Sequence, residues 1–186
     1  MREEPRSGCP INAAIEVLGD RWSFIVLRDI IFGDRRRFRE LLANSEEGIA
    51  SNILSSRLKS LVAAGLLTHD PAPRGRRAAY SLTEAGIQTV PIMAALASWG
   101  LRHRPTTHEL RVRAQLLEEG GPPLWHDLMD ELREAHLGIP RPDPDRPRAA
   151  DQLAAAYRRA VAGGSGDGRS SAIVAPAAGV SGPHAR

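Results

Sequence analysis

The sequence predicts a mainly α-helical fold that carries one small β-hairpin. Apolar residues recur at helical spacing along most of the first 104 residues. Between Leu66 and Leu82 the pattern changes to two short apolar runs separated by DPAPRGRRA. Two prolines and a glycine exclude a long helix from that separator. The chain of 186 residues is long enough for one core with a smaller appendage.

Three helices are expected before Ile49. The first begins at Cys9-Pro10, because proline suits a first helical turn, and it ends at Gly19. Its apolar residues are expected to face a core: Ile11, Ala14, Ile15 and Leu18. The second covers about Trp22 to Phe32, and its nearly unbroken apolar composition predicts the central buried helix. The third is the short stretch Phe38–Asn44, closed by a turn that reaches Gly48.

A fourth helix is expected over Ala50–Ala64, followed by Gly65 as its end. Its apolar side chains form a single stripe that should be buried: Leu54, Leu58, Leu61 and Val62. Two short strands follow, at Leu66–His69 and Ala79–Leu82. Thr83 is a suitable N-cap for a fifth helix that reaches about Leu101, and Pro91 should kink that helix or delay its regular part.

The sequence patterns that predict helices and strands are weaker beyond Arg104. One helix around Leu110–Leu117 should end at Gly120-Gly121, and another should run from about Leu124 to Ala135. Prolines at positions 140, 142, 144 and 147 predict an extended linker over residues 138–150. Asp151 should cap a last helix that ends near Ala162, and the tail over residues 163–186 is expected to be disordered.

These elements divide the chain into a domain over residues 9–104, a helical C-terminal extension over residues 105–162, and the tail. Residues 1–104 hold 15 Arg and Lys against 11 Asp and Glu, whereas residues 105–186 hold 10 against 11. The basic excess therefore lies in the first domain, where nucleic acid would gain from it. No apolar run approaches the roughly 18 residues of a membrane span, and the N-terminus lacks an apolar signal segment. A cytoplasmic location is therefore expected.

The third and fourth helices have the order of a helix-turn-helix, whose second helix can lie in the major groove of DNA. If the leucine stripe is buried, short polar side chains and one cation project outward: Ser51, Asn52, Ser55, Ser56 and Lys59. Serine and asparagine can read base edges or bind phosphate at close range. A merely solvated helix face would also be polar, so the helix alone leaves both interpretations open.

The hairpin adds a basic tip at Arg74, Arg76 and Arg77. Arginine favours narrow minor grooves and pairs with phosphates, although a lone arginine loop can also be solvated charge. Polar helix, basic hairpin and capping helix in this order favour DNA binding. They predict a winged helix-turn-helix, mainly α with a small β-wing. A second basic run is either surface charge or a set of phosphate contacts, with Arg37 as its DNA-binding candidate: Arg35, Arg36, Arg37 and Arg39.

The ordered motifs CP, LGDRWSFIVLRDIIFG, RRFRELL, GIASNILSSRLKSLVAAGLL, YSLTEAG and ASWG span about Cys9 to Gly100. Together they resemble the HxlR-type winged helix-turn-helix transcriptional regulators, relatives of the MarR group. The resemblance implies a homodimer, assembled through the N-terminal and post-wing helices, on a pseudo-palindromic operator. It also implies repression or activation at a promoter, of which we expect repression. Such proteins often carry Ser in place of Ala50 and Pro in place of Ser51, so the N-cap here is Ala50 or Ser51.

Cys9 stands where several regulators of this type carry a reactive thiol, and a helix N-terminus favours the thiolate. The alternative, which we favour, is a small packing residue at the dimer interface. A single cysteine excludes an internal disulfide and a multi-cysteine metal site. The histidines show no metal-ligand spacing, and nothing resembles a nucleophile–base pair or a phosphate loop. Neither an enzyme site nor a metal or cofactor is therefore expected.

The sequence thus predicts a homodimeric, sequence-specific regulator of transcription that binds double-stranded DNA. The rival hypothesis is a protein-interaction module whose winged helix has lost DNA binding. A small-molecule-sensing role is compatible with the first hypothesis. It would require the C-terminal extension and the fifth helix to line a pocket with Trp99, Trp125 and Met129. Such residues are more often plain core or dimer contacts.

Overall fold

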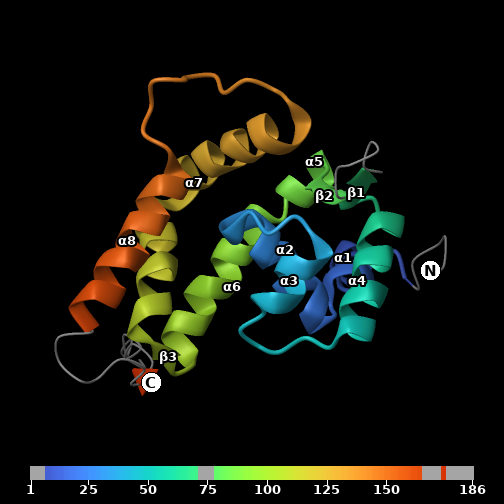
Figure 1. Ribbon diagram of the computed structural model, residues 1–186, viewed down its shortest axis with the longest axis horizontal. Coiled ribbons are helices and arrows are strands. Elements are labelled where there is room, and N and C mark those ends of the chain that lie inside the picture. The colour runs from blue at the N-terminus through green and yellow to red at the C-terminus, as the bar shows by residue number, and fades with distance from the viewer. Residues whose placement is uncertain (1–6, 71–77, 165–172, 175–186) are drawn as a thin grey trace, which may run out of the picture. The chain divides into compact units, whose positions relative to one another are not determined.

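The computed structural model describes residues 7–70, 78–164 and 173–174 (Figure 1). Two compact units emerge, and residues 132–142 belong with the chain up to Thr89. The first unit holds α1 (Pro10–Leu18), α2 (Arg21–Gly33), α3 (Phe38–Ala43), α4 (Ser51–Ala63), β1 (Leu67–Asp70), β2 (Ala79–Leu82) and α5 (Glu84–Ile87). The second holds α6 (Val90–His103), β3 (Thr106–Thr107), most of α7 (His108–Leu137), α8 (Ala149–Gly164) and β4 (Ile173–Val174). The fold is mainly helical with a small β-wing, as predicted.

α2 is the central helix of the first unit. Asp20 caps it, because its Oδ1 accepts the N–H groups of Trp22 at 3.0 Å and Ser23 at 3.1 Å. These bonds satisfy donors that a helix start leaves open. The helix buries four apolar side chains: Val26, Leu27, Ile30 and Ile31. Other apolar residues of the helix, Phe24 and Ile25 among them, are only half-buried. The prediction of a central helix is confirmed.

α4 packs against α2 through one stripe of leucines. Leu54, Leu58 and Leu61 are at most 1% exposed, as the spacing predicted. Val62, expected in the same stripe, is only half-buried. The deviation follows from helix geometry, because Val62 lies about 100° around the helix from Leu61 and so at the edge of the stripe. The buried leucines leave the opposite face of α4 free for other contacts.

α1 does not bury the apolar face that its spacing predicts. Ile11 and Ile15 are 70% and 59% exposed, and Ala14 is exposed as well. Only Leu18, at the end of the helix, is buried. The prediction that these residues face a core of this chain is therefore wrong for the first three. Helical spacing identifies an apolar face, but it does not reveal which molecule covers that face.

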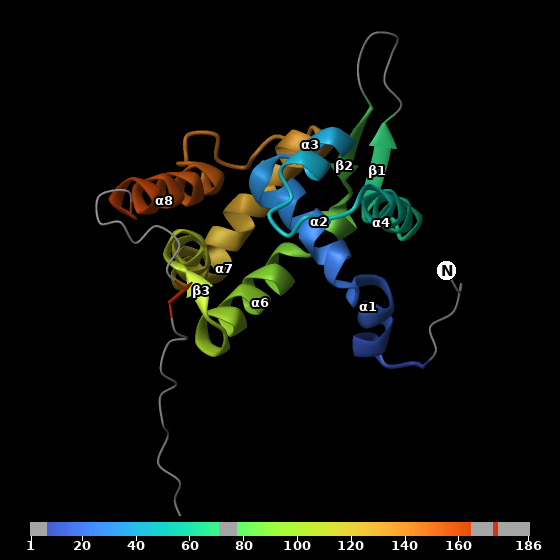
Figure 2. The same cartoon turned by 60° about the horizontal axis from the view of Figure 1, so that its bottom comes forward.

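β1 and β2 form the base of the wing and lie beside α4 (Figure 2). The strands are antiparallel, with Leu67 opposite Leu82. β2 has its predicted bounds, whereas β1 begins one residue later than expected. Gly86 allows α5 to approach the turn before β1, because a Cβ there would lie 2.2 Å from the carbonyl oxygen of Leu66. The hairpin is thus packed between α4 and α5.

The predicted fifth helix is two helices. Thr83 caps α5 as expected, and its Oγ1 accepts the Gly86 N–H at 3.1 Å. α5 ends at Ile87 and α6 begins at Val90. Pro91 therefore lies in the first turn of α6, where a missing N–H breaks no helical bond. Of the two predicted effects of Pro91 the delay is observed, and the expectation of one continuous helix is wrong.

The second unit contains a break in α7 where the sequence predicts a helix end. Gly121 adopts φ 54° and ψ −154°, which interrupts the helix before Pro122. Glu118 ties the first half of α7 to α6, because its Oε1 accepts the Ser98 hydroxyl at 2.6 Å and pairs with Arg102. α8 lies alongside α7 (Figure 1), with the Arg113 guanidinium 4.2 Å from the centre of the Tyr157 ring.

α8 begins before the residue expected to cap it. The carboxylate of Glu131, only 5% exposed, accepts the N–H groups of Ala149 and Ala150. Asp151 therefore lies inside the helix, and the prediction that it is the cap is wrong because a side chain from α7 takes that role. Within the tail, β4 pairs antiparallel with β3, and the other residues from 165 onward lie outside the described residues. No described helix is both long and apolar enough to cross a membrane.

Candidate nucleic-acid interface

α4 presents two chemically different faces. One is the leucine stripe that packs against α2. The other face carries the five polar residues predicted for this helix, which follow the helical spacing i, i+1, i+4, i+5 and i+8: Ser51, Asn52, Ser55, Ser56 and Lys59. Four of them are exposed, and Ser55 is half-buried. This face offers short hydrogen-bonding side chains near the helix start and one cation two turns later.

The N-terminus of α4 carries no side-chain cap. The helix begins at Ser51 with Ala50 as its N-cap, which decides between the two starts that the sequence left open. Alanine has no side-chain acceptor, so no side-chain hydrogen bond closes this end. Ala50 and Ser51 are both exposed. The first N–H groups of the helix thus face a surface where an anion can approach.

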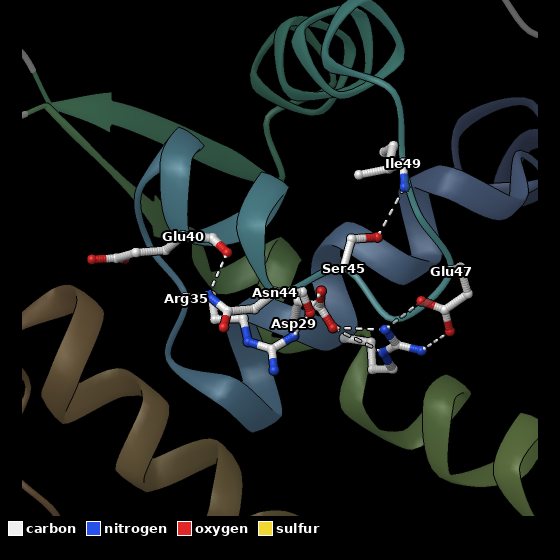
Figure 3. Close-up of polar contacts among 8 residues, drawn as sticks. Asp29, Arg35, Glu40, Asn44, Ser45, Glu47 and Ile49 are labelled. Carbon is white, nitrogen blue, oxygen red and sulfur yellow. Dashed lines mark hydrogen bonds and ion pairs between the residues drawn. The ribbon is translucent and has the colours of Figure 1, made fainter.

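The turn between α3 and α4 is tied to α2 by charged side chains (Figure 3). Arg28 donates to both carboxylate oxygens of Glu47, at 2.5 and 2.9 Å. It also donates to Oδ1 of Asp29, at 2.8 and 3.0 Å. Asp29 in turn pairs with Arg35 at 3.2 Å, and Arg35 donates to the carbonyl of Asn44 at 2.7 Å. The start of the turn, at Asn44, is therefore bonded to Arg35 just after α2. Its middle, at Glu47, is bonded to Arg28 of α2.

The charges of this network stabilise one another. The hydrogen bonds from Arg28 hold the pKa of Glu47 below its usual value. Burial alone would lower the pKa of Arg28, but its bonds to Glu47 and Asp29 outweigh burial and raise it. Both partners are therefore charged near neutral pH. Because Asp29 is only 6% exposed, its two arginine partners also compensate a carboxylate held away from water.

Local bonds complete the turn. The Asn44 side chain donates to the carbonyl of Glu40 at 2.8 Å, and the Ser45 hydroxyl accepts the Ile49 N–H at 3.1 Å (Figure 3). Gly48 adopts φ +67°, a conformation that favours glycine. Ile49 is buried. These contacts fix the direction in which α4 leaves the turn.

The arginines of the basic run that leads into α3 have different bonding partners in the structure. Arg35 belongs to the network with Asp29. Arg36 donates to the carbonyl of Tyr80 at 3.2 Å and to the Ser81 hydroxyl. Both side chains are half-buried and donate hydrogen bonds within the fold. Sequence reasoning could not find the role of Arg36, because Tyr80 and Ser81 lie 44 and 45 positions further along the chain.

The later arginines of this region are more accessible. Arg37 is 51% exposed and pairs with Glu40 at 2.8 Å, which lowers the pKa of Glu40. Arg39 is exposed. Arg57, which the sequence analysis did not single out, lies on α4 at 3.7 Å from the Asp20 carboxylate. That contact links α4 to the start of α2.

The described part of the wing is its base. His69 of β1 stacks on Tyr80 of β2, with ring centres 4.6 Å apart, a cross-strand pair that supports the hairpin. The predicted basic tip, Arg74, Arg76 and Arg77, lies outside the described residues.

Cys9 is exposed at the N-cap of α1. Its backbone N–H donates to the Ser7 hydroxyl at 3.4 Å. A thiol at this place can react with an oxidant, and it can equally pack against a partner, so both predicted roles stay open.

The residues considered for an effector pocket differ in their surroundings. Trp99 is 53% exposed, whereas Met129 is 2% exposed and belongs to the core of the second unit. Trp125 is half-buried and donates its Nε1–H to the carbonyl of Leu117 at 2.7 Å. Within the described ranges, no group of three or more His, Cys, Asp or Glu residues could hold a metal ion.

Comparison with known proteins identifies the family. A family model described as HxlR-like helix-turn-helix matches residues 17–108, which include the turn, α4 and the wing. The HTH-type transcriptional regulator Rv3095 of Mycobacterium tuberculosis is 38% identical over 99 residues, covering 53% of this chain and 61% of that protein. The HTH-type transcriptional regulator YvaP of Bacillus subtilis is 31% identical over 93 residues, covering 49% of this chain and 84% of that protein.

The solved structure of the reduced form of the transcriptional regulator YodB from B. subtilis is 25% identical, with a TM-score of 0.43 over 50% of this chain and 92% of that one. The chain spans about three fifths of the length of the mycobacterial relative. The family match confirms the resemblance seen in the sequence motifs. The Bacillus relative YvaP confirms it too, because this chain covers 84% of its length. The chain belongs to the HxlR-like helix-turn-helix family of transcriptional regulators.

Proposed function

We propose that this chain binds double-stranded DNA sequence-specifically as a homodimer and represses transcription from a pseudo-palindromic operator. The observation that carries the proposal is the exposed polar face of α4, opposite the leucines that hold the helix on α2. The second helix of a helix-turn-helix enters the major groove with its N-terminal residues against base edges. The family membership supports the same activity.

The residues would divide into two chemical roles. Side chains near the start of α4 would read base edges: Ser51, Asn52, Ser55 and Ser56. Asn52 is the most selective of them, because an amide can bond both N6 and N7 of adenine. Lys59 and Arg37 would contact phosphates and set the register on the duplex. The wing arginines stay a prediction from the sequence, as phosphate or minor-groove contacts: Arg74, Arg76 and Arg77.

Exposed apolar side chains support the homodimer. In the first unit α1 exposes Ile11 and Ile15. In the second unit, α6 separately exposes Ile92, Leu96 and Trp99, each at least 41% accessible. Clustered apolar residues on a surface mark protein contacts. A two-fold dimer would present its two α4 helices to half-sites about 34 Å apart.

Selection from random DNA tests the proposal. The full-length chain would be incubated with a random-sequence duplex library about three helical turns long, and bound duplexes would be amplified and sequenced. We expect an inverted repeat to be enriched, and its binding constant should fall linearly with salt on logarithmic axes. Lys59→Gln should reduce that slope by about one.

Two outcomes would overturn the proposal. If no sequence is enriched, and the DNA upstream of the gene that encodes the chain is not bound at low salt, the rival hypothesis of a protein-interaction module is favoured. If transcription in vitro from a promoter that carries the selected repeat rises when the chain is added, the repressor assignment is wrong.

The same binding assay decides between the two roles of Cys9. A sensing thiol predicts loss of DNA binding after treatment with diamide, and Cys9→Ser should be insensitive. Identical responses of the two chains would remove the sensing role and leave the packing role.

A further inference from the structure

The last turn of α7 belongs to the winged-helix unit. Residues 132–142 group with residues up to Thr89 and not with the rest of α7. They lie outside the family match, which ends at residue 108. Arg133 donates from Nε and Nη2 to the carboxylate of Glu84 at 3.0 and 2.6 Å. Glu84 is the first residue of α5, directly after β2. This two-point contact therefore joins the end of α7 to the base of the wing.

His136 makes a second contact, to the strand itself. Its Nδ1 accepts the backbone N–H of Leu82 at 3.2 Å. Leu82 is completely buried, so this N–H has no access to water. A buried N–H without an acceptor destabilises the fold. His136 thus supplies the acceptor that the outer side of β2 needs.

Arg36 makes the third contact and connects α7 with the start of α3. Its Nη1 donates to the carbonyl of Ala135 at 3.4 Å, and its Nη2 donates to the Ser81 hydroxyl. The Tyr80 N–H in turn donates to the Arg36 carbonyl at 2.8 Å. One arginine therefore bonds the end of α7, the strand β2 and the segment before α3.

From these contacts we infer that the end of α7 positions the wing for DNA binding. We name Arg36, Arg133 and His136 the α7 clamp. The inference rests on the proposed DNA-binding function, and it adds that residues 132–142 of the C-terminal extension are part of the DNA-binding unit. None of the three needs to touch DNA; they are positioning residues that act through β2.

The physical reason is the weakness of an isolated hairpin. A two-stranded hairpin is at best marginally stable alone, so the direction of its tip depends on what holds its base. The α7 clamp bonds Ser81, Leu82 and Glu84, three residues at the end of β2 and the start of α5. A loop held in its binding geometry loses less conformational freedom when it binds. The clamp should therefore raise affinity without adding a phosphate contact.

Binding of the selected duplex by full-length variants tests the inference. Arg133→Ala and His136→Ala should each weaken binding about tenfold, with an unchanged slope against salt because no phosphate contact is lost. Lys59→Gln is the matched control, because it should reduce the slope by about one.

Conservative variants separate positioning from general damage to the fold. His136→Asn places Oδ1 where Nδ1 lies, and it should bind DNA like the parent chain. The double variant Arg133→Glu with Glu84→Arg restores the ion pair in reverse and should bind more tightly than Arg133→Glu alone. All variants would be compared at a temperature where circular dichroism finds them folded.

Three results would overturn the inference. Folded clamp variants could bind like the parent chain, in which case the clamp serves stability alone. Arg133→Ala could lower the salt slope by one, which would make Arg133 a phosphate contact. The conservative variants could fail to recover binding. Failure of the parent chain to bind any duplex is a different result, which removes the proposed function and the clamp's role with it.

Discussion

Two polar surfaces of the first unit look alike in the sequence and differ in the structure. The run that leads into α3 carries more charge, yet Arg35 and Arg36 donate their hydrogen bonds within the fold. The outer face of α4 has short polar side chains and one lysine, and most of these are exposed. The number of charges along the chain therefore does not show which polar groups remain accessible, and in this unit the outer face of α4 keeps more of them exposed.

The two surfaces also depend on each other. Arg35 holds the carbonyl of Asn44 at the start of the turn, and Arg28 holds Glu47 in its middle. These bonds set the direction of α4, so the internal arginines support the face that we propose for DNA. Changing an internal arginine should therefore affect folding first, whereas changing the outer face of α4 should affect binding first.

The two faces of α4 provide the largest expected effect. Leu58→Ala should lower the free energy of unfolding by about 3 kcal/mol, because the leucine is completely buried and its loss leaves a cavity. Asn52→Ala, on the exposed face, should change it by less than about 0.5 kcal/mol. Urea unfolding followed by circular dichroism measures both. Similar losses in the two variants would contradict the division of the helix into a core face and a free face.

The arginine run provides the next effect. Arg36→Ala should lower the free energy of unfolding by about 2 kcal/mol, because it leaves the acceptors at Tyr80, Ser81 and Ala135 without their charged donor. Arg39→Ala is the matched control, since Arg39 is exposed, and it should stay within about 0.5 kcal/mol of the parent chain. If Arg39→Ala proves as destabilising as Arg36→Ala, the distinction between internal and free arginines fails.

The smallest expected effect is a pH dependence from His136. Burial, and less strongly the charge of Arg36, lowers its pKa from 6.5 to about 4. Between these values the unfolded chain binds more protons, so the free energy of unfolding should fall as pH drops from 6.5 towards 4. Because the side chain is only partly buried, we expect a loss of about 1 kcal/mol. Above 6.5 this group makes no difference to the pH profile.

His136→Asn is the control for that profile, since it keeps an acceptor for the Leu82 N–H and removes the titrating ring. Urea unfolding at several pH values should show a flatter profile for this variant than for the parent chain between pH 4 and 6.5. If the free energy of unfolding depends on pH in the same way in the two chains, protonation of His136 does not contribute to that dependence.

The sequence could predict the parts of the fold whose signals are local. Helical spacing identifies the buried leucines of α4, and Thr83 marks the start of α5 through its own hydroxyl. The exposed polar face of α4 follows from the same spacing. These features depend on residues within one or two turns of each other, which periodicity describes well.

Features that depend on distant partners could not be predicted. Arg28 and Glu47 lie 19 positions apart, and Arg36 and Ala135 lie 99 apart. Glu131 caps α8 from another helix, where local reading assigned the cap to Asp151. Helical spacing also identified the apolar face of α1, but it could not show that this face is exposed. Ile11 has no cover among the described residues. For Arg28, Arg36 and Glu131 the residue type is ordinary, and only the fold reveals the partner.

If the exposed face of α4 reads base edges, Asn52→Ala should change the DNA sequence that the chain prefers. Selection from the random library would be repeated with this variant, and both chains would be titrated with both enriched duplexes. We expect one position in each half-site to lose its preferred base, and affinity for the parental duplex to fall about tenfold or more with an unchanged salt slope. The same enriched sequence and the same affinity for both chains would contradict it.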